Sequence, residues 1–186
     1  MHDIRIKDWA AAAAPVTSIC EETEKVLAMK LLVFSDSHGD VRHMEAAVRR
    51  DRPDMVLHLG DVNPDARALK KRFPDVPMEW VCGNCDGRRS DLEEERVLEI
   101  QGRRILMMHG HTRHVKLGMG AAVWAAREAQ AHILLFGHTH EDFCEYHEGL
   151  WVMNPGTIRG GWAGATYGVI CLEGENTVCY TLKQED

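Results

Sequence analysis

The stretch ILLFGHTH, residues 133–140, joins an apolar run to two histidines. Ile133–Phe136 has the length and composition of a buried strand, and Gly137 follows it directly. His138 and His140 are two residues apart, so their side chains project the same way if the chain is extended there. Neutral imidazole is the commonest metal-ligating side chain. Taken alone, such a pair is equally compatible with a surface or core feature.

Four further apolar runs end in the same way, at residues that can bind a metal ion. In chain order these are Leu31–Ser35 before Asp36-Ser37-His38-Gly39, Met55–Leu59 before Gly60-Asp61, Trp80–Cys82 before Gly83-Asn84-Cys85-Asp86, and Ile105–Met108 before His109-Gly110-His111. If the runs are strands of open α/β sheets, their carboxyl ends share one crevice, where such folds bind ligands. It is improbable that five apolar runs would each end at a metal-binding residue by chance. The sequence therefore predicts a dinuclear metallohydrolase.

Three of these motifs suit particular positions in a dinuclear centre. Asp36 and His38 both reach the crevice only if the chain bends there, and Gly39 permits such a bend. Asp61 suits the shared position, because the two oxygens of a carboxylate can bridge two cations. Asn84 offers a neutral amide oxygen, which is a weak ligand that matters only beside others.

The bulk composition fits one ordinary domain with a real core, at 186 residues and 45% hydrophobic content. The formal net charge is −7, from 22 basic and 29 acidic residues. Strong nucleic-acid binding is not expected, because nonspecific binding to phosphate backbones depends on basic surface. No apolar run approaches the ~20 residues that a membrane helix needs.

The cysteines favour a reducing, cytoplasmic location, because the chain is too large to need a disulfide framework and shows no secretory signal. They are Cys20, Cys82, Cys85, Cys144, Cys171 and Cys179. Cys82 and Cys85 form a C-x-x-C, which is compatible with a redox pair or half of a zinc site. Without a second such motif, both are minor alternatives.

Residues 1–28 form an N-terminal extension, and residues 29–186 are expected to be one domain. The extension lacks the apolar central region of a signal peptide, and its alanine run stops at Pro15. Since Met29 opens the first predicted strand, it is a candidate natural start. A short ordered arm or helix is the alternative for the extension.

The rest of the chain alternates between predicted helices and strands. Apolar spacing predicts helices over Asp40–Arg52, Asn63–Phe73 and Leu117–Gln130. A hairpin is predicted to turn at Gln101-Gly102. The predicted late strands are Leu150–Met153, Tyr167–Leu172 and Thr177–Leu182, with a turn over Glu173–Asn176. The charged run Asp91–Arg96 is predicted to be a solvated loop or helix face.

The ordered set of five motifs resembles the calcineurin-like metallophosphoesterase superfamily. Asn154-Pro155-Gly156-Thr157, after the last histidines, fits as well. The small size, and Gly83-Asn84-Cys85-Asp86 in place of the usual Gly-Asn-His-Asp, resemble its small bacterial and archaeal YfcE-type phosphodiesterases. The resemblance covers Met29 to the C-terminus and does not extend to residues 1–28.

This resemblance implies an α/β fold, a four-layer α/β/β/α sandwich, and two metal sites. By analogy Asp36, His38 and His140 hold one divalent cation, Asn84, His109 and His138 hold the other, and Asp61 bridges them. Manganese is the family-typical metal, and mixed nitrogen and oxygen ligands also suit iron, nickel or zinc. The implied reaction is in-line attack on a small phosphodiester by a hydroxide between the cations.

The departure from the family pattern is Cys85, where the wider superfamily has a histidine that helps to orient substrate or protonate the leaving group. A thiol is a weak hydrogen-bond donor with a pKa near 8.5, so it does this poorly. We therefore expect a slow enzyme on poor leaving groups. His111 is the best remaining candidate to contact phosphate, and a supporting or core role is equally compatible. Asp86 is expected to order the loop. The candidate catalytic set is Asp61, Asn84, Cys85, Asp86 and His111.

Two other functions stay open. One is hydrolysis of phosphomonoesters or nucleotides. The other is a non-catalytic protein scaffold, as in a retromer subunit of this size within the superfamily. Arg88, Arg89 and Arg159 follow site motifs and could steer a phosphate, with solvated surface as the alternative. Open sheet edges would permit a homo-oligomer.

Overall fold

The computed structural model describes residues 28–87, 92–160 and 164–184. Its first sheet has the strand order β10-β9-β1-β2-β3. The parallel strands are β1 (Met29–Phe34), β2 (Met55–His58) and β3 (Met78–Trp80). Two antiparallel strands, β9 (Thr166–Glu173) and β10 (Asn176–Lys183), complete the sheet on the other side of β1.

The second sheet has the order β4-β5-β6-β8-β7. Its strands are β4 (Glu95–Ile100), β5 (Arg103–Met108), β6 (Ile133–Leu135), β7 (Asp142–His147) and β8 (Leu150–Pro155). The strands β5, β6 and β8 run parallel, while β4 and β7 are antiparallel edges. The five apolar runs that end at site motifs therefore lie on β1, β2, β3, β5 and β6.

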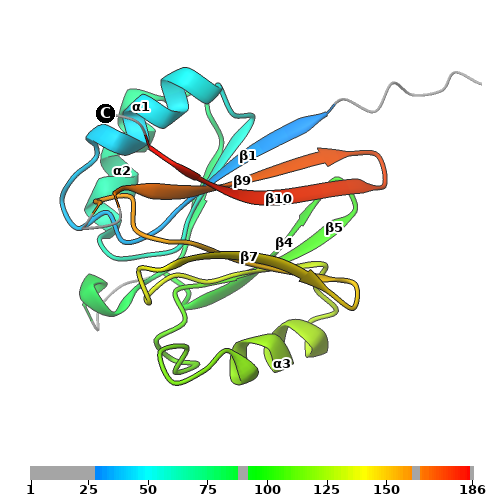
Figure 1. Cartoon of the computed structure of the whole chain (residues 1–186). Coiled ribbons are helices and arrows are strands. Elements are labelled where there is room, and N and C mark those ends of the chain that lie inside the picture. Colours follow the sequence, from blue (N-terminus) through cyan, green and yellow to red (C-terminus); the bar gives the residue numbers. More distant parts are fainter. Residues whose placement is uncertain (1–27, 88–91, 161–163, 185–186) are drawn as a thin grey trace, which may run out of the picture.

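Helices cover the two outer faces of the paired sheets (Figure 1). The first sheet is covered by α1 (Arg42–Asp51) and α2 (Asn63–Arg72), and the second by α3 (Gly120–Glu128). A short 3₁₀ turn, η1 (Asn84–Asp86), follows β3. The predicted four-layer α/β/β/α sandwich is confirmed.

The core explains why the runs are continuously apolar instead of alternating. In β1, Leu31 and Val33 pack between the two sheets, whereas Leu32 and Phe34 pack beneath the helices. A parallel strand that is buried on both faces needs apolar side chains at every position. The run then ends abruptly where the chain leaves the core.

Some predicted boundaries were wrong. The helix α3 begins at Gly120 and not at Leu117, because residues 111–117 form turns. Glu95 and Arg96 belong to β4, where Arg96 pairs with Glu79, so part of the charged run is a strand. The predicted hairpin turn at Gln101-Gly102 is present. The strand β7 was not predicted, since it is a mostly exposed edge strand in which polar and apolar residues are equally frequent.

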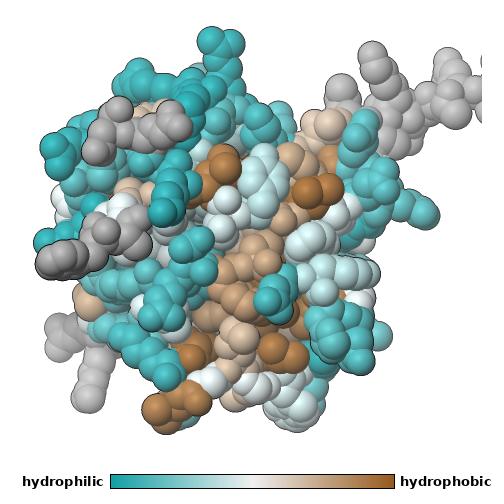
Figure 2. All heavy atoms as spheres, viewed as in Figure 1, coloured by the Kyte–Doolittle hydropathy of each residue, from teal (hydrophilic) through white to brown (hydrophobic). Residues whose placement is uncertain are grey.

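The surface differs between the helical and the strand-edge sides. Figure 2 shows a mainly apolar area in the middle of the face, where β10 and β7 lie in Figure 1. Exposed apolar side chains of β10 are Val178, Tyr180 and Leu182. This edge is open to pairing, and the homo-oligomer stays a prediction. Residues 1–27 lie outside the described part of the chain. No described helix is long and apolar enough to cross a membrane.

Candidate metal centre

The loops that follow β1, β2, β5 and β6 are tied together by backbone hydrogen bonds. The Asp36 N–H donates to Gly60 O (3.1 Å), and the Gly137 N–H donates to His109 O (3.1 Å). A third bond joins the two sheets, from the His138 N–H to Asp36 Oδ2 (3.1 Å). Of the seven predicted ligands, the first sheet's loops carry Asp36, His38, Asp61 and Asn84, and the second sheet's loops carry His109, His138 and His140.

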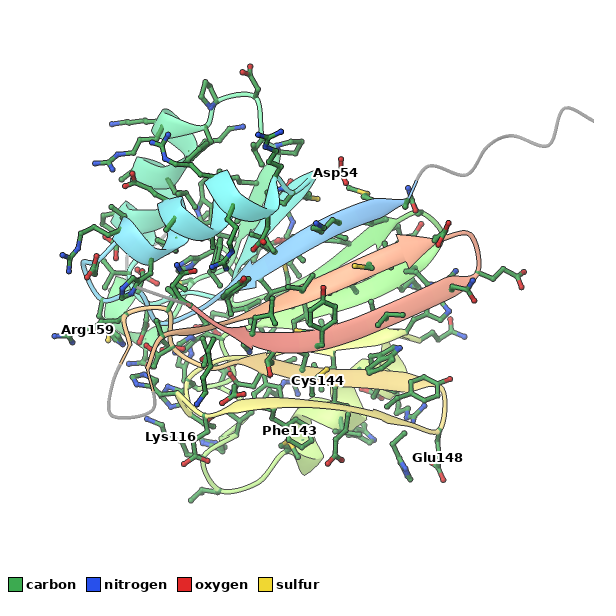
Figure 3. All side chains as sticks on the ribbon, turned by 45° about the horizontal axis from the view of Figure 1, so that its top comes forward. Asp54, Lys116, Phe143, Cys144, Glu148 and Arg159 are labelled. Atoms are coloured by element: carbon green, nitrogen blue, oxygen red, sulfur yellow. The ribbon has the colours of Figure 1, made fainter. Side chains whose placement is uncertain are left out.

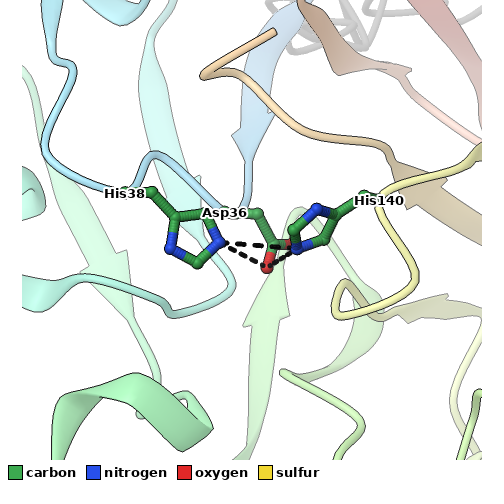
Figure 4. A group of neighbouring side chains, drawn as sticks. All are labelled: Asp36, His38 and His140. Carbon is green, nitrogen blue, oxygen red and sulfur yellow. Dashed lines mark hydrogen bonds and ion pairs between the residues drawn. The ribbon is translucent and has the colours of Figure 1, made fainter. Parts of the chain in front are cut away.

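One group of ligand atoms comes from Asp36, His38 and His140 (Figure 4). The Nε2 atoms of His38 and His140 are 3.4 Å apart, and they lie 3.8 and 3.1 Å from Asp36 Oδ1. Asp36 Oδ1 is buried and makes no hydrogen bond of acceptable geometry with the described residues. A buried carboxylate oxygen in that state needs another partner. A cation between these three atoms would satisfy it.

A second group of ligand atoms comes from Asp36, Asp61 and His109. His109 Nε2 is 3.5 Å from Asp61 Oδ2 and 3.1 Å from Asn84 Oδ1. Because His109 Nδ1 lies 2.9 Å from Leu59 O, it must carry the proton and donate, as in many metal-ligating histidines. Burial lowers the pKa of His109, so the ring is neutral and Nε2 presents a lone pair. Two lone pairs then face each other at Asn84 and His109, an arrangement that a cation stabilises.

His138 and His111 stand beside this second group. The His138 ring centroid lies 5.0 Å from that of His109, and the His111 centroid lies 5.4 Å from it. Burial first, and then the neighbouring His109, lower the pKa of His138 to about 4, so this ring is also neutral near pH 7. His111 Nδ1 is buried without a hydrogen-bond partner in the described chain. Both rings border the predicted second metal site.

In the first group of ligand atoms, the protonation states of Asp36 and His140 depend on the contacts that these side chains make. Burial tends to raise the pKa of Asp36, but the rings of His140 and His109 and the Ser35 hydroxyl outweigh it, so the net shift is downward. The contact with Asp36 raises the pKa of His140. The carboxylate is therefore the stable form of Asp36, as a metal ligand requires.

The backbone at the site is unusual. Five predicted ligands have left-handed conformations, with φ values of 56° at Asp36, 44° at His38, 47° at Asp61, 69° at His138 and 64° at His140. Each such non-glycine residue costs roughly 1–2 kcal/mol. Strained backbone of this kind gathers at functional sites, where the surrounding structure enforces it. The bend expected at Gly39 is thus made largely by the ligand residues themselves.

Gly83 allows a close approach of two site loops. A Cβ at this position would lie 2.1 Å from Asp61 Oδ1 and 2.5 Å from the Asp61 backbone nitrogen. We expect Gly83→Ala to displace Asp61 and to weaken manganese binding by roughly 10–100-fold, as changes around metal ligands do. Isothermal titration calorimetry measures this. In the control Gly120→Ala, the added methyl meets open space, so metal affinity should not change. Equal affinity of both variants and the parent would refute this role of Gly83.

Cys85 and Asp86 occupy η1 beside Asp61. The Cys85 N–H donates to Asp61 Oδ1 (2.7 Å), and Asn84 Nδ2 donates to Cys85 Sγ (3.3 Å). A side-chain hydrogen bond with Asp61, followed by burial, raises the pKa of Cys85 to about 11, so the thiol is protonated at neutral pH. Asp86 accepts backbone hydrogen bonds from Asp61 (3.1 Å), Gly83 (2.8 Å) and Asn63. These hydrogen bonds hold the loop against Asp61. Cys82 and Cys85 are both free thiols.

Two further residues, Asp65 and Thr157, support the loop that carries Asp36 and His38. Asp65 accepts hydrogen bonds from Ser37 Oγ and from the Gly39 N–H, each at 2.7 Å. Thr157 Oγ1 donates to Asp36 O (2.8 Å). Asp65 was not singled out in the sequence, whereas Thr157 lies in the Asn154-Pro155-Gly156-Thr157 motif. Arg88 and Arg89 lie outside the described residues.

A four-layer sandwich with carboxylate, amide and imidazole groups gathered at the carboxyl ends of its strands defines a metal-dependent phosphoesterase. Residues 29–177 match the model of the calcineurin-like phosphoesterase superfamily domain. The chain belongs to this superfamily.

Named relatives extend the comparison. The probable metallophosphoesterase YsnB of Bacillus subtilis (strain 168) is 32% identical over 152 residues, covering 79% of this chain and 86% of that protein. The phosphodiesterase MJ0936 of Methanocaldococcus jannaschii is 27% identical over 164 residues, covering 78% of this chain and 94% of that protein. The structure of vacuolar protein sorting 29 from Cryptosporidium parvum superposes with a TM-score of 0.73 at 22% identity, covering 86% and 93% of the two chains. At that identity the likeness shows the fold alone.

Proposed function

We propose that this metallophosphoesterase is a phosphodiesterase with a dinuclear metal centre. The observation that carries the proposal is the convergence of ligand atoms: Asp36 Oδ1 lies against His38 and His140 Nε2 without a hydrogen bond of acceptable geometry in the described chain, and the lone pairs of His109 and Asn84 face each other. A cation between these ligand atoms would supply a better partner than they offer each other. The ligand assignment is Asp36, His38 and His140 for one ion and Asn84, His109 and His138 for the other, with Asp61 shared.

Two divalent cations, with manganese as the first choice, would polarise the phosphoryl group and make a water acidic enough to supply hydroxide near neutral pH for in-line displacement. The chain's own residues orient the metal ligands and hold them in place. Leu59 O fixes the His109 ring, and Ser35 and the His138 N–H fix one oxygen of Asp36. His111, whose Nδ1 is buried without a hydrogen-bond partner in the described chain, is the side chain placed to donate a hydrogen bond to the phosphate.

Cys85 favours diesters with good leaving groups over monoesters. A protonated thiol of raised pKa is a poor proton donor to a departing alkoxide. The aryloxide group of an activated diester departs without a proton donor. Relatives named as probable metallophosphoesterase and phosphodiesterase support the same class.

A substrate panel tests the proposal. With manganese, we expect turnover of bis-p-nitrophenyl phosphate well above that of p-nitrophenyl phosphate, measured as kcat/KM, and loss of turnover after chelation. A preference for the monoester or for nucleotides would identify a phosphatase instead. Absence of turnover with manganese, iron, nickel and zinc would indicate a non-catalytic scaffold.

A further inference from the structure

The sulfur of Cys85 lies close to two of the proposed metal ligands. One ring nitrogen of His38, one carboxylate oxygen of Asp61 and the Cys85 sulfur all lie within 4.8 Å of one another. Zinc binds thiolate sulfur at about 2.3 Å and imidazole nitrogen at about 2.0–2.1 Å, so two such ligand atoms on one ion are at most about 4.4 Å apart. The three atoms are therefore close to the spacing that a single cation requires.

Hydrogen bonds within and around η1 fix the position of this sulfur. The Cys85 N–H donates to Asp61 Oδ1 (2.7 Å), and Asn84 Nδ2 donates to Cys85 Sγ (3.3 Å). Asp86 holds the same turn by accepting the backbone N–H groups of Asp61 and Gly83. A hydrogen bond donated to sulfur favours its charged form, the thiolate. Residues that orient a metal ligand in this way are typical of metal sites.

The neighbours of the sulfur place it beside the first ion. His38 and Asp61 both belong to the ligand set proposed for that ion, and Cys85 is close to both of them. Thiolate is a soft ligand that favours zinc, whereas carboxylate oxygen suits manganese. A thiol among carboxylates and imidazoles can therefore change which metal ion the centre prefers.

We propose that Cys85 is a further metal ligand that distinguishes zinc from manganese, because its sulfur coordinates the first ion when that ion is zinc and not when it is manganese. On zinc binding the Sγ–H bond breaks, the proton passes to solvent, and a sulfur lone pair forms the bond to zinc. No oxidant or reductant is needed, since a thiol that coordinates a cation is simply deprotonated. This inference rests on the metal centre of the proposed function, but its test measures coordination and not turnover.

X-ray absorption spectroscopy of the metal-loaded protein tests the bond directly. At the zinc edge, the parent should show a sulfur neighbour at about 2.3 Å, and the Cys85→Ser variant should lack it. At the manganese edge, the parent should show only oxygen and nitrogen neighbours. Calorimetry should show that Cys85→Ser lowers zinc affinity at least about 10-fold more than manganese affinity, since even residues that only support a ligand have effects of this size.

Two other thiols supply matched controls. Cys82→Ser removes the partner of Cys85 in the C-x-x-C, and Cys144→Ser removes a half-buried thiol of β7, which Figure 3 shows along the body of the sandwich. Both variants should keep the sulfur neighbour of zinc. Thermal unfolding confirms that each variant is folded, and Cys82→Ala replaces Cys82→Ser if that variant is not. Loss of the sulfur neighbour on substitution of Cys82 would identify a C-x-x-C zinc pair and overturn the proposal.

The possible outcomes separate this inference from the proposed function. Zinc with only oxygen and nitrogen neighbours, in a protein that hydrolyses diesters with manganese, would overturn the role of Cys85 and leave the proposed function intact. A sulfur neighbour in a protein that turns over no ester with any metal would support Cys85 as a ligand and refute the catalytic proposal. A parent protein that binds neither zinc nor manganese would overturn both.

Discussion

The Asp61→Asn variant should bind less metal and lose at least about 100-fold in kcat/KM toward bis-p-nitrophenyl phosphate. Mutation of a residue that only supports a metal ligand typically lowers metal affinity or activity by roughly 10–100-fold. The loss of a ligand shared by two cations should have a larger effect. Asp61 Oδ2 lies 3.5 Å from His109 Nε2, and Oδ1 accepts the Cys85 N–H. An amide keeps this shape but lacks the charge that two cations require. Elemental analysis of the purified variant and steady-state kinetics measure the two effects.

The same variant should be at least as stable as the parent when no metal is present. Ligand oxygens of Asp36 and Asp61 lie within 4.8 Å of each other, so their charges repel unless a cation lies between them. Thermal unfolding in a chelator should show an unchanged or higher Tm for Asp61→Asn, and added manganese should stabilise only the parent. The exposed Asp75→Asn is the control for charge alone. Full metal content in Asp61→Asn would remove Asp61 from the ligand set.

The Cys85→His variant should gain activity toward poor leaving groups. Cys85 lies on η1, where its backbone already touches Asp61 and its side chain is exposed. Imidazole can donate a proton near neutral pH, and general acid catalysis is typically worth about 10²–10⁴-fold. We expect the lower end of that range, because Asp86 is occupied by three backbone N–H groups and cannot fully support a new imidazole. The measurement is kcat across aryl and alkyl esters.

The way in which the rate of Cys85→His depends on the leaving group distinguishes proton donation from a general increase in activity. Proton donation should help alkyl esters and p-nitrophenyl phosphate more than the activated diester, so the rate should depend less steeply on leaving-group pKa. Cys85→Ser is the control, because a hydroxyl is also a weak proton donor. If Cys85→His alters no substrate, the thiol does not limit the chemistry.

The sequence was most informative where burial on both faces left a continuous apolar run. The run Ile133–Phe136 and its counterparts could be placed in strands of α/β sheets, and the four-layer arrangement followed from the resemblance to the superfamily. β7 could not be found, because an exposed edge strand has no such pattern. The left-handed backbone of Asp36 and His140 also could not be predicted from the sequence, since it is imposed by contacts between distant loops.

The division of the seven donors between two sheets has a mechanical consequence. A cation held by Asp36 and His140 would cross-link the sheets at one end, whereas at the opposite end they are joined by core packing and by hydrogen bonds from Arg103 to Thr177 Oγ1 and Gly174 O. Tight metal binding then stabilises the folded state by mass action. Amide hydrogen exchange should therefore slow on metal loading mainly in the loops at the site end, and withdrawal of the metal should let that end of the sandwich open first.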